Sequence, residues 1–273
     1  MKDDLVEQLM GEVIRKMGGS DSSSSSEPQP QAKAAPAKAP KACQLTEFVG
    51  TAIGDTIGVV IANVDPALHE AMKIDKKYRS IGIVGARTGA GPHIFAADEA
   101  VKATNSEVLV IELPRDTKGG GGHGSLVIFG AADVSDARRA VEVMLGELDR
   151  TFGDVYGNDA GHLEFQYTAR ASFALNKAFG APVGQAFGIT VGSPAAIGVL
   201  MADTAAKAAT VDAVGYATPG NGGTSYSNEV IYMFSGDSGA VRQSIHAARD
   251  VGKQLLSTLD PTTELKSTTT PYI

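Results

Sequence analysis

The sequence of 273 residues contains one cysteine, no tryptophan and fewer basic than acidic residues. The single thiol, Cys43, excludes an intramolecular disulfide and a four-thiolate metal site, so a reducing compartment is expected. A formal net charge of -7 argues against nucleic-acid binding, which needs a positive field. No apolar run approaches the length of a membrane span, and the acidic start lacks the apolar core of a signal peptide. We therefore expect a soluble cytoplasmic protein without nucleic-acid or membrane partners.

Metal-binding and paired-carboxylate motifs are also lacking. No two histidines lie at the i, i+4 spacing of a helical metal site, and we expect neither a metal ion nor a cofactor. The histidines are His69, His93, His123, His162 and His246. Asp98 and Asp203 occupy corresponding places, but we interpret them as charges at helix starts rather than as an acid and a base.

The chain repeats itself at a spacing of about 105 residues. Residues 97–103 (ADEAVKA) return as residues 202–208 (ADTAAKA), with five of seven positions identical. Flanking segments match at spacings of 107 and 103. A period of this length indicates two copies of a whole domain. Fusion of two related domains suggests that together they form a surface that would otherwise be built from separate identical subunits. Assembly is therefore our first hypothesis.

Each half is predicted to mix helices and strands, which indicates an α/β fold. In the first half the pattern predicts a helix over 66–72, capped by Asp65 with Pro66 in its first turn. The other predicted elements there are strands over 56–62, 80–84, 108–111 and 126–129 and helices over 96–104 and 135–148. The second half is expected to repeat this order between residues 165 and 255.

The N-terminal region differs in character from the rest. Leu5, Leu9 and Val13 form one apolar stripe of a short helix, which we expect to fold against a partner. Packing onto its own domain is the alternative. The predicted organisation is a helix over 1–19, a disordered linker over 20–44, domains over 45–150 and 151–260, and a tail over 261–273.

Two motifs suggest enzymes but lack the required context. The segment GDSGA at 236–240 is similar to the nucleophile region of trypsin-like proteases, yet Ser238 takes the place of Ser135 in the repeat. Each of these serines precedes a helical stretch, where its oxygen can accept a first-turn amide proton. The segment GGGGHG at 119–124 leads into a strand, which contradicts a phosphate-binding loop.

We interpret the glycine-rich loop and its counterpart at 218–227 as flexible loops around a shared opening. An active site is the less favoured alternative. The residues expected to line the opening are Pro114, Arg115, Asp116, Lys118, Gly119, Gly120, Gly121, Gly122, His123, Asn221, Gly222, Gly223, Thr224 and Ser225.

The repeated ADxAxKA motif, with GDSGAVR at 236–242, resembles the bacterial microcompartment shell domain. The strand and helix of 56–72, placed ahead of the motif, resemble the tandem, circularly permuted type. Residues 45–55 and 85–93 are most similar to shell proteins of propanediol-utilisation compartments. The resemblance covers residues 45 to about 258 and implies two tandem domains, each a small, mostly antiparallel sheet flanked by helices.

The resemblance also implies a non-enzymatic homotrimer, shaped as a pseudo-hexamer, that tiles with other shell proteins. Lys102, Lys207 and Arg170 would lie at the tile edge, although the first-half counterpart of Arg170 is Asn63. The loops would form pores that pass or bind small polyols such as diols or glycerol, and the N-terminal segment would tether enclosed enzymes. A tandem α/β enzyme or small-ligand sensor with a site between the halves is the alternative.

Overall fold

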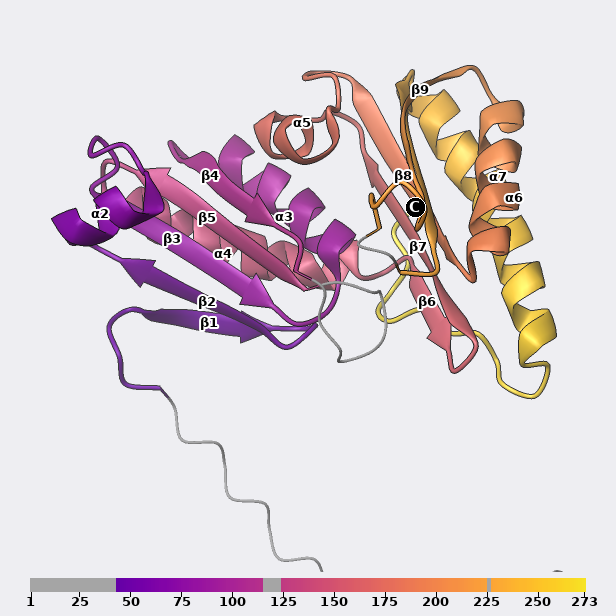
Figure 1. Ribbon diagram of the computed structural model, residues 1–273, viewed down its shortest axis with the longest axis horizontal. Helices are drawn as coiled ribbons and strands as arrows, with labels where there is room; N and C mark the ends of the chain where they lie inside the picture. Colours follow the sequence, from indigo (N-terminus) through magenta and orange to yellow (C-terminus); the bar gives the residue numbers. More distant parts are fainter. Residues whose placement is uncertain (1–42, 115–123, 225–226) are drawn as a thin grey trace, which may run out of the picture. The chain divides into compact units, whose positions relative to one another are not determined.

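The computed structural model describes residues 43–114, 124–224 and 227–273 (Figure 1). Residues 43–273 form one compact unit. The predicted N-terminal helix with Leu5, Leu9 and Val13 and the linker up to residue 42 lie outside the described residues. So do Arg115, Asp116, Lys118, Gly119, Gly120, Gly121, Gly122, His123 and Ser225.

The first domain, residues 48–151, is a five-stranded antiparallel sheet with three helices (Figure 1). The strand order is β1-β2-β3-β5-β4. The strands are β1 (Phe48–Ala52), β2 (Thr56–Ile61), β3 (Ser80–Ala86), β4 (Glu107–Glu112) and β5 (Ser125–Ala131). The helices are α2 (Pro66–Met72), α3 (Ala90–Lys102) and α4 (Val134–Thr151).

The second domain, residues 155–259, repeats this arrangement with the order β6-β7-β8-β10-β9. The strands are β6 (Val155–Asn158), β7 (Gly161–Thr168), β8 (Ala186–Ser193), β9 (Val211–Ala217) and β10 (Val230–Gly236). The helices are α5 (Phe173–Phe179), α6 (Ala195–Ala208) and α7 (Ser238–Leu259). The predicted fold class, two tandem domains with antiparallel sheets flanked by helices, is confirmed.

Helix α2 shows how local chemistry sets an element. The Asp65 side chain accepts a hydrogen bond from the Ala67 N–H at 2.8 Å, and Pro66 occupies the first helical position, where its missing N–H is not needed. The helix ends at Lys73, which takes the left-handed conformation. The predicted span of 66–72 and its cap are both confirmed.

The predicted serine caps were wrong. Helix α7 is capped by Asp237, whose Oδ1 accepts from the Gly239 N–H at 2.9 Å. Ser238 lies inside the helix and shares a hydrogen bond of 2.5 Å with the Tyr167 hydroxyl. Ser135 likewise follows the start of α4, for which Asp133 is the N-cap residue. In both helices an aspartate one or two residues before the serine takes the cap position, so the serine is already helical.

The start of α3 was predicted six residues too late. Pro92 lies in the first helical turn, where a residue without N–H is tolerated, so the helix begins before residue 96 and includes Gly91 and Pro92. Asp98 therefore lies in the interior of α3. Asp203 likewise lies in the interior of α6. The interpretation of both as charges at the start of their own helices was wrong.

Each sheet is covered by a long amphipathic helix. Helix α4 buries Val141, Met144 and Leu148 on the first sheet, and α7 buries Val241 and Ile245 on the second. Gly82 of β3 allows this close packing, because a Cβ there would lie 2.5 Å from the Ala137 carbonyl oxygen. The domains thus have separate cores, which leaves their other surfaces for contact with one another.

The tail that follows α7 binds back to both domains, and the Thr269 hydroxyl donates to the Asp149 carbonyl of the first domain. The Thr268 N–H donates to the Val155 carbonyl, and the Tyr272 hydroxyl donates to the Tyr167 carbonyl at 3.1 Å. Asp154 is fully buried, pairs with Arg249 at 2.7 Å and accepts from the Tyr272 N–H. No helix among the described residues is long and apolar enough to cross a membrane.

Candidate functional site

The two domains meet along a seam, with α3 on one side and α5 and β7 on the other. Ile94 and Phe95 of α3 are buried there together with Leu175 and Phe187 of the second domain. The rings of Phe95 and Phe187 stack with centroids 6.0 Å apart. The seam therefore has an apolar core of its own.

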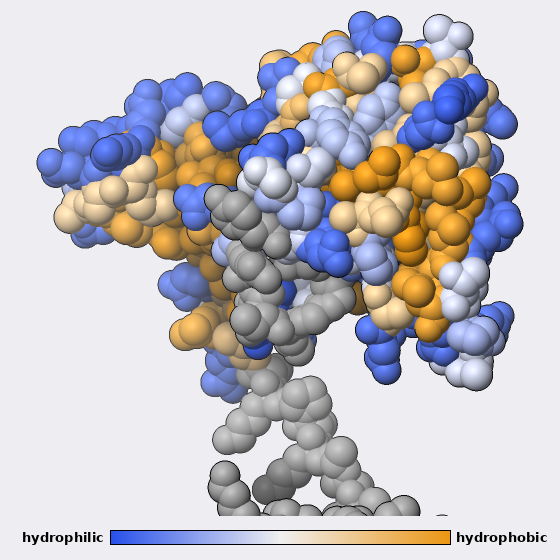
Figure 2. All heavy atoms as spheres, turned by 45° about the vertical axis from the view of Figure 1, so that its right-hand side comes forward, coloured by the Kyte–Doolittle hydropathy of each residue, from blue (hydrophilic) through white to orange (hydrophobic). Residues whose placement is uncertain are grey.

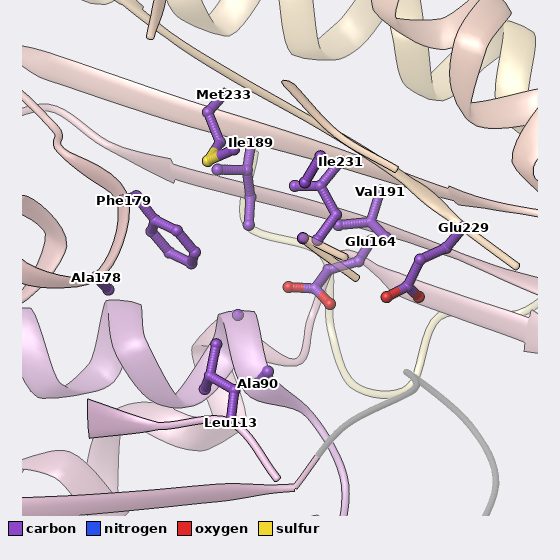
Figure 3. A pocket seen from close by; sticks show the side chains of 13 residues that line it. Ala90, Leu113, Glu164, Ala178, Phe179, Ile189, Val191, Glu229, Ile231 and Met233 are labelled. Carbon is purple, nitrogen blue, oxygen red and sulfur yellow. The ribbon is translucent and has the colours of Figure 1, made fainter. Parts of the chain in front are cut away.

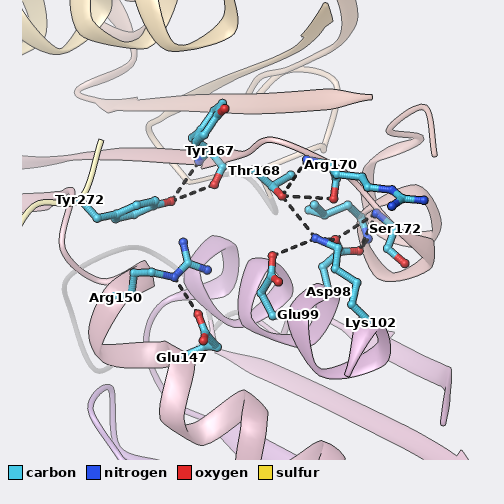
Figure 4. A network of polar contacts seen from close by, with 11 residues as sticks. Asp98, Glu99, Lys102, Glu147, Arg150, Tyr167, Thr168, Arg170, Ser172 and Tyr272 are labelled. Atoms are coloured by element: carbon cyan, nitrogen blue, oxygen red, sulfur yellow. Dashed lines mark hydrogen bonds and ion pairs between the residues drawn. The ribbon is translucent and has the colours of Figure 1, made fainter. Parts of the chain in front are cut away.

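Asp98 connects the two domains through its carboxylate (Figure 4). It accepts from the Ser172 N–H at 3.0 Å and from the Leu175 N–H at 3.1 Å, at the start of α5. Lys102 pairs with it at 2.9 Å. Burial raises the pKa of Asp98, while Lys102 and the two N–H groups offset part of that rise. The partners of Asp98 are backbone N–H groups of the second domain and a lysine of its own helix, so Asp98 links α3 to the start of α5 across the seam.

The predicted edge residues have different environments. Lys102 is 26% exposed and bonds Asp98, Glu99 and, at 3.3 Å, the Thr168 hydroxyl (Figure 4). Lys207 is 74% exposed and pairs with Asp203 at 2.7 Å. Lys102 and the exposed Arg170 line the same open groove, which has a volume of about 500 Å³. The groove does not include Lys207.

Helix α6 carries the second copy of the motif, but no element among the described residues covers its outer face. At the repeat spacing of 105 residues, Ile94 matches Val199 and Phe95 matches Leu200. Val199 is 49% exposed and Leu200 is 45% exposed. Figure 2, in which this side of the second domain comes forward, shows a broad apolar surface. Such a surface on a folded domain indicates a contact with another molecule.

A cavity of about 320 Å³ lies where the two domains meet (Figure 3). Its walls are mainly apolar, and two carboxyl groups, from Glu164 of β7 and Glu229 just before β10, point into it at one end. The first domain contributes Ala90, Gly91 and Leu113. The second domain contributes Ala178, Phe179, Ile189, Val191, Ala217, Gly223, Ile231 and Met233 besides the two glutamates.

Glu164 is an acid of the cavity whose pKa is strongly raised. It is buried, and its Oε1 atom has no hydrogen-bond partner among residues 43–114, 124–224 and 227–273. Burial first, and then the charge of Glu229, raise the pKa of Glu164 to about 8, while a hydrogen bond with Gln166 opposes the rise. A Cβ on Gly91 would overlap Oε1, so only glycine leaves room for this carboxyl group.

Glu229 is also buried and accepts from His162 Nε2 at 2.9 Å. Sequence reasoning missed both glutamates. The available indication was a glutamate between Leu163 and Phe165 in β7, a residue type that is rarely buried without a reason.

The predicted opening residues that the structure describes lie at the bases of the two loops. The Gly124 N–H donates to the carbonyl of the exposed Pro114, which closes the first loop. Asn221 Oδ1 accepts from the Thr218 and Gly223 N–H groups, so Asn221, Gly222 and Gly223 form a compact turn. Thr224 is buried, and its hydroxyl donates to the Ser227 carbonyl. Leu113 and Gly223, which adjoin the two loops, both line the cavity.

No three potential metal ligands among the described residues come together in a group that could hold an ion. The GDSGA segment also lacks the surroundings of a protease, because the Ser238 hydroxyl bonds the Tyr167 hydroxyl rather than a histidine.

Comparisons with known proteins agree with this architecture. The BMC domain model matches residues 186–263. The chain is 64% identical over 256 residues, 94% of each protein, to the bacterial microcompartment shell protein PduB of Salmonella typhimurium. It is 54% identical to PduB of Limosilactobacillus reuteri, covering 77% of this chain and 89% of the relative.

Solved structures give the same result. EtuB from Clostridium kluyveri superposes with a TM-score of 0.81 and 56% identity, covering 85% of this chain and 100% of EtuB. A trimeric bacterial microcompartment shell protein PduB superposes with a TM-score of 0.79 and 50% identity, covering 84% and 100%. The chain belongs to the bacterial microcompartment shell proteins, and its role is structural.

Proposed function

We propose that three copies of this chain form a ring-shaped tile of a microcompartment shell, with six similar domains around a threefold axis. The observation that carries this proposal is the pair of matched helices, α3 covered and α6 uncovered. One similar protein of known structure is described as trimeric.

The surface that would receive α6 lies on the first domain of another copy. Helix α2 matches α5, the helix that α3 covers, at a spacing of 107 residues. Leu175 of α5 is fully buried, whereas its counterpart Leu68 of α2 is 38% exposed. A contact of α6 with α2 would therefore repeat the internal seam between copies. Such a head-to-tail contact closes into a ring when its rotation fits.

The contact between copies would differ from the internal seam in one polar detail. Asp65 already caps α2 from within the first domain, as Asp98 caps α5 across the seam. Asp203, the counterpart of Asp98, is therefore not needed as a cap and pairs with Lys207. Light scattering at micromolar concentration should give the mass of a trimer, and a stable monomer would contradict the proposal.

Lys102, Lys207 and Arg170 are proposed to contact neighbouring tiles. Long basic side chains can lie flat across a neighbour while their charged ends reach carbonyl groups. Lys207 and Arg170 are exposed, as this role requires. Electron microscopy of sheets formed by the purified protein, alone and with other shell proteins, would test this role.

The loops at 114–124 and 218–227 are proposed to border pores for small polyols. The cavity at their bases, with its polar end and apolar walls, suits molecules of the size of diols or glycerol. Replacing Gly120 and Gly121 by alanine would restrict the first loop. Diol flux into shells that carry this variant should differ from the parent flux.

The N-terminal segment is proposed to bind an enclosed enzyme through Leu5, Leu9 and Val13. The apolar stripe is too short to form a stable helix alone, which favours folding on a partner. Leu9→Asp should leave trimers and sheets intact and lower the cargo of purified compartments. Equal cargo in variant and parent compartments would favour the alternative, in which the segment packs onto its own domain. A tandem enzyme with a site between the domains is not favoured, because the relatives found are shell proteins.

A further inference from the structure

A groove with an excess of positive charge lies at the seam, where α3 and α4 of the first domain meet residues of β7, α7 and the tail. The groove is open and has a volume of about 500 Å³. Its charged lining residues are Glu99, Lys102, Glu147, Arg150, Arg170 and Arg242. Four cations and two acids therefore line one groove in a protein whose formal net charge is -7. Such a local reversal of sign attracts an anionic partner.

Both acids of the groove are already paired. Lys102 Nζ lies 2.8 Å from Glu99 Oε1 and also binds the buried Asp98 at 2.9 Å. Arg150 Nε donates to Glu147 Oε2 at 2.7 Å (Figure 4). Lys102 and Arg150 thus neutralise acids of their own helices, so the excess charge of the groove comes from its two other arginines.

These two arginines, Arg170 and Arg242, are exposed, and among the described residues neither guanidinium group forms an ion pair or a hydrogen bond. Arg170 is held through its main chain, because its N–H donates to the Thr168 hydroxyl at 3.3 Å. The Arg242 guanidinium lies over the Tyr167 ring, 5.5 Å from its centroid, and the Tyr167 hydroxyl is bonded to Ser238. Stacking on a ring leaves the N–H edges of a guanidinium group free to bond an anion.

The repeat shows that the fold does not require this charge. At the spacing of 107 residues Arg170 matches Asn63, which is neutral. At the spacing of 103 residues Arg242 matches Arg139, which pairs with Glu142 at 3.5 Å. The first domain forms the same sheet and the same long helix without two unpaired guanidinium groups at these places. The two arginines therefore belong to the groove and not to the sheet.

The shape and the chemistry of the groove indicate a protein partner. Sites for small molecules are concave and mostly apolar, whereas this groove is open and lined by charged side chains. The planar fork of arginine matches a carboxylate through two parallel N–H···O bonds. We propose that the groove binds an extended acidic segment of another protein, with one carboxylate on Arg242 and a second on Arg170. This inference goes beyond the proposed tile contact, in which Arg170 reaches carbonyl groups and Arg242 takes no part.

Binding of a fluorescein-labelled hexaglutamate peptide to the full-length protein, measured by fluorescence anisotropy at neutral pH and low ionic strength, tests the inference. The parent should bind the peptide saturably, although the net charge of the protein repels it. Arg242→Gln and Arg170→Gln should each weaken binding by about tenfold, because each removes hydrogen bonds to a charged group. The double variant should bind more weakly than either single variant.

Arg139→Gln is the matched control, since it removes the same charge from the first domain, outside the groove, and should bind as the parent does. Arg242→Lys keeps the charge without the fork and should bind more weakly than the parent but more tightly than Arg242→Gln. A neutral hexaglutamine peptide should not bind. Light scattering would verify that each variant keeps the assembly state of the parent.

Absence of saturable binding by the parent, or parent-like binding by the double variant, would overturn the inference. An equal loss in Arg139→Gln would also overturn it, because the effect would then follow net charge rather than the groove. Saturable binding of inorganic pyrophosphate without binding of the peptide would replace the protein partner by a small oxyanion. The proposed tile contact of Arg170 is judged separately, by the sheets that the purified protein forms.

Discussion

Helices α3 and α6 carry the same motif, but their outer faces have opposite environments. Ile94 and Phe95 of α3 are buried against the second domain, whereas the matched Val199 and Leu200 of α6 are about half exposed. The local sequences are alike, so the difference comes from the connectivity of the chain, which closes one seam internally. An exposed apolar face whose counterpart is buried thus supports the proposed contact between copies.

Charging the exposed face of α6 should have the largest effect. Val199→Asp combined with Leu200→Asp removes apolar burial worth about 1.5–3 kcal/mol per side chain and adds charges at every proposed contact between copies. We expect monomers at micromolar concentration by light scattering, with an unchanged circular dichroism spectrum. The control Gln254→Asp adds charge to an exposed position of α7 and should keep the trimer. A double variant that remains trimeric would place the contact elsewhere.

Alanine substitutions at the matched apolar residues of α3 and α6 should distinguish a contact that stabilises one chain from a contact between copies. Phe95→Ala should lower the free energy of unfolding by about 3–5 kcal/mol, because it opens a cavity in the internal seam. Leu200→Ala should cost less than about 1 kcal/mol in the monomer and instead make the melting temperature fall more steeply on dilution. Equal losses at low protein concentration would mean that α6 is already covered within one chain.

Replacing Asp98 should lower the free energy of unfolding more than replacing its counterpart Asp203, by a smaller margin than for Phe95 and Leu200. Asp98→Ala leaves the Ser172 and Leu175 N–H groups without their acceptor, at a cost of about 1–3 kcal/mol. Asp203→Ala breaks only an exposed ion pair and should change the free energy of unfolding by less than about 0.5 kcal/mol. Urea unfolding of both variants measures the difference, and similar values would refute the structural role of Asp98.

The smallest effect on stability is expected for Lys207→Ala, less than about 0.5 kcal/mol, because its ion pair is exposed. Electron microscopy should nevertheless show fewer or smaller sheets if Lys207 contacts a neighbouring tile. Lys102→Ala should reduce sheets and also stability, since it removes the cation beside the buried Asp98. Unchanged sheets in both variants would remove these lysines from the tile edge.

Features governed by neighbouring residues were predictable. The cap of α2 depends on Asp65 and Pro66 alone, and the predicted span agrees with the structure. The start of α3 was missed because glycine and proline, which usually interrupt helices, lie in its first turn. The predicted serine caps were wrong because an aspartate one or two residues earlier occupies the N-cap position of each helix.

The partners of Asp98 and the cavity acids were not predictable from local patterns. Asp98 bonds residues more than seventy positions away, so its helix alone carries no indication of that role. Strand β7 is covered on both faces, and the alternation that distinguishes a buried face from an exposed one is therefore absent around Glu164.

The sequence by itself determined that the protein consists of two related α/β domains, because the repeat and the apolar spacing persist whatever the domains contact. Only the tertiary structure decided which copy of each element is covered, that Asp98 joins the domains, and that Glu164 and Glu229 share one cavity. These properties depend on residues distant in the chain, and burial and hydrogen bonding arise only when folding brings such residues together.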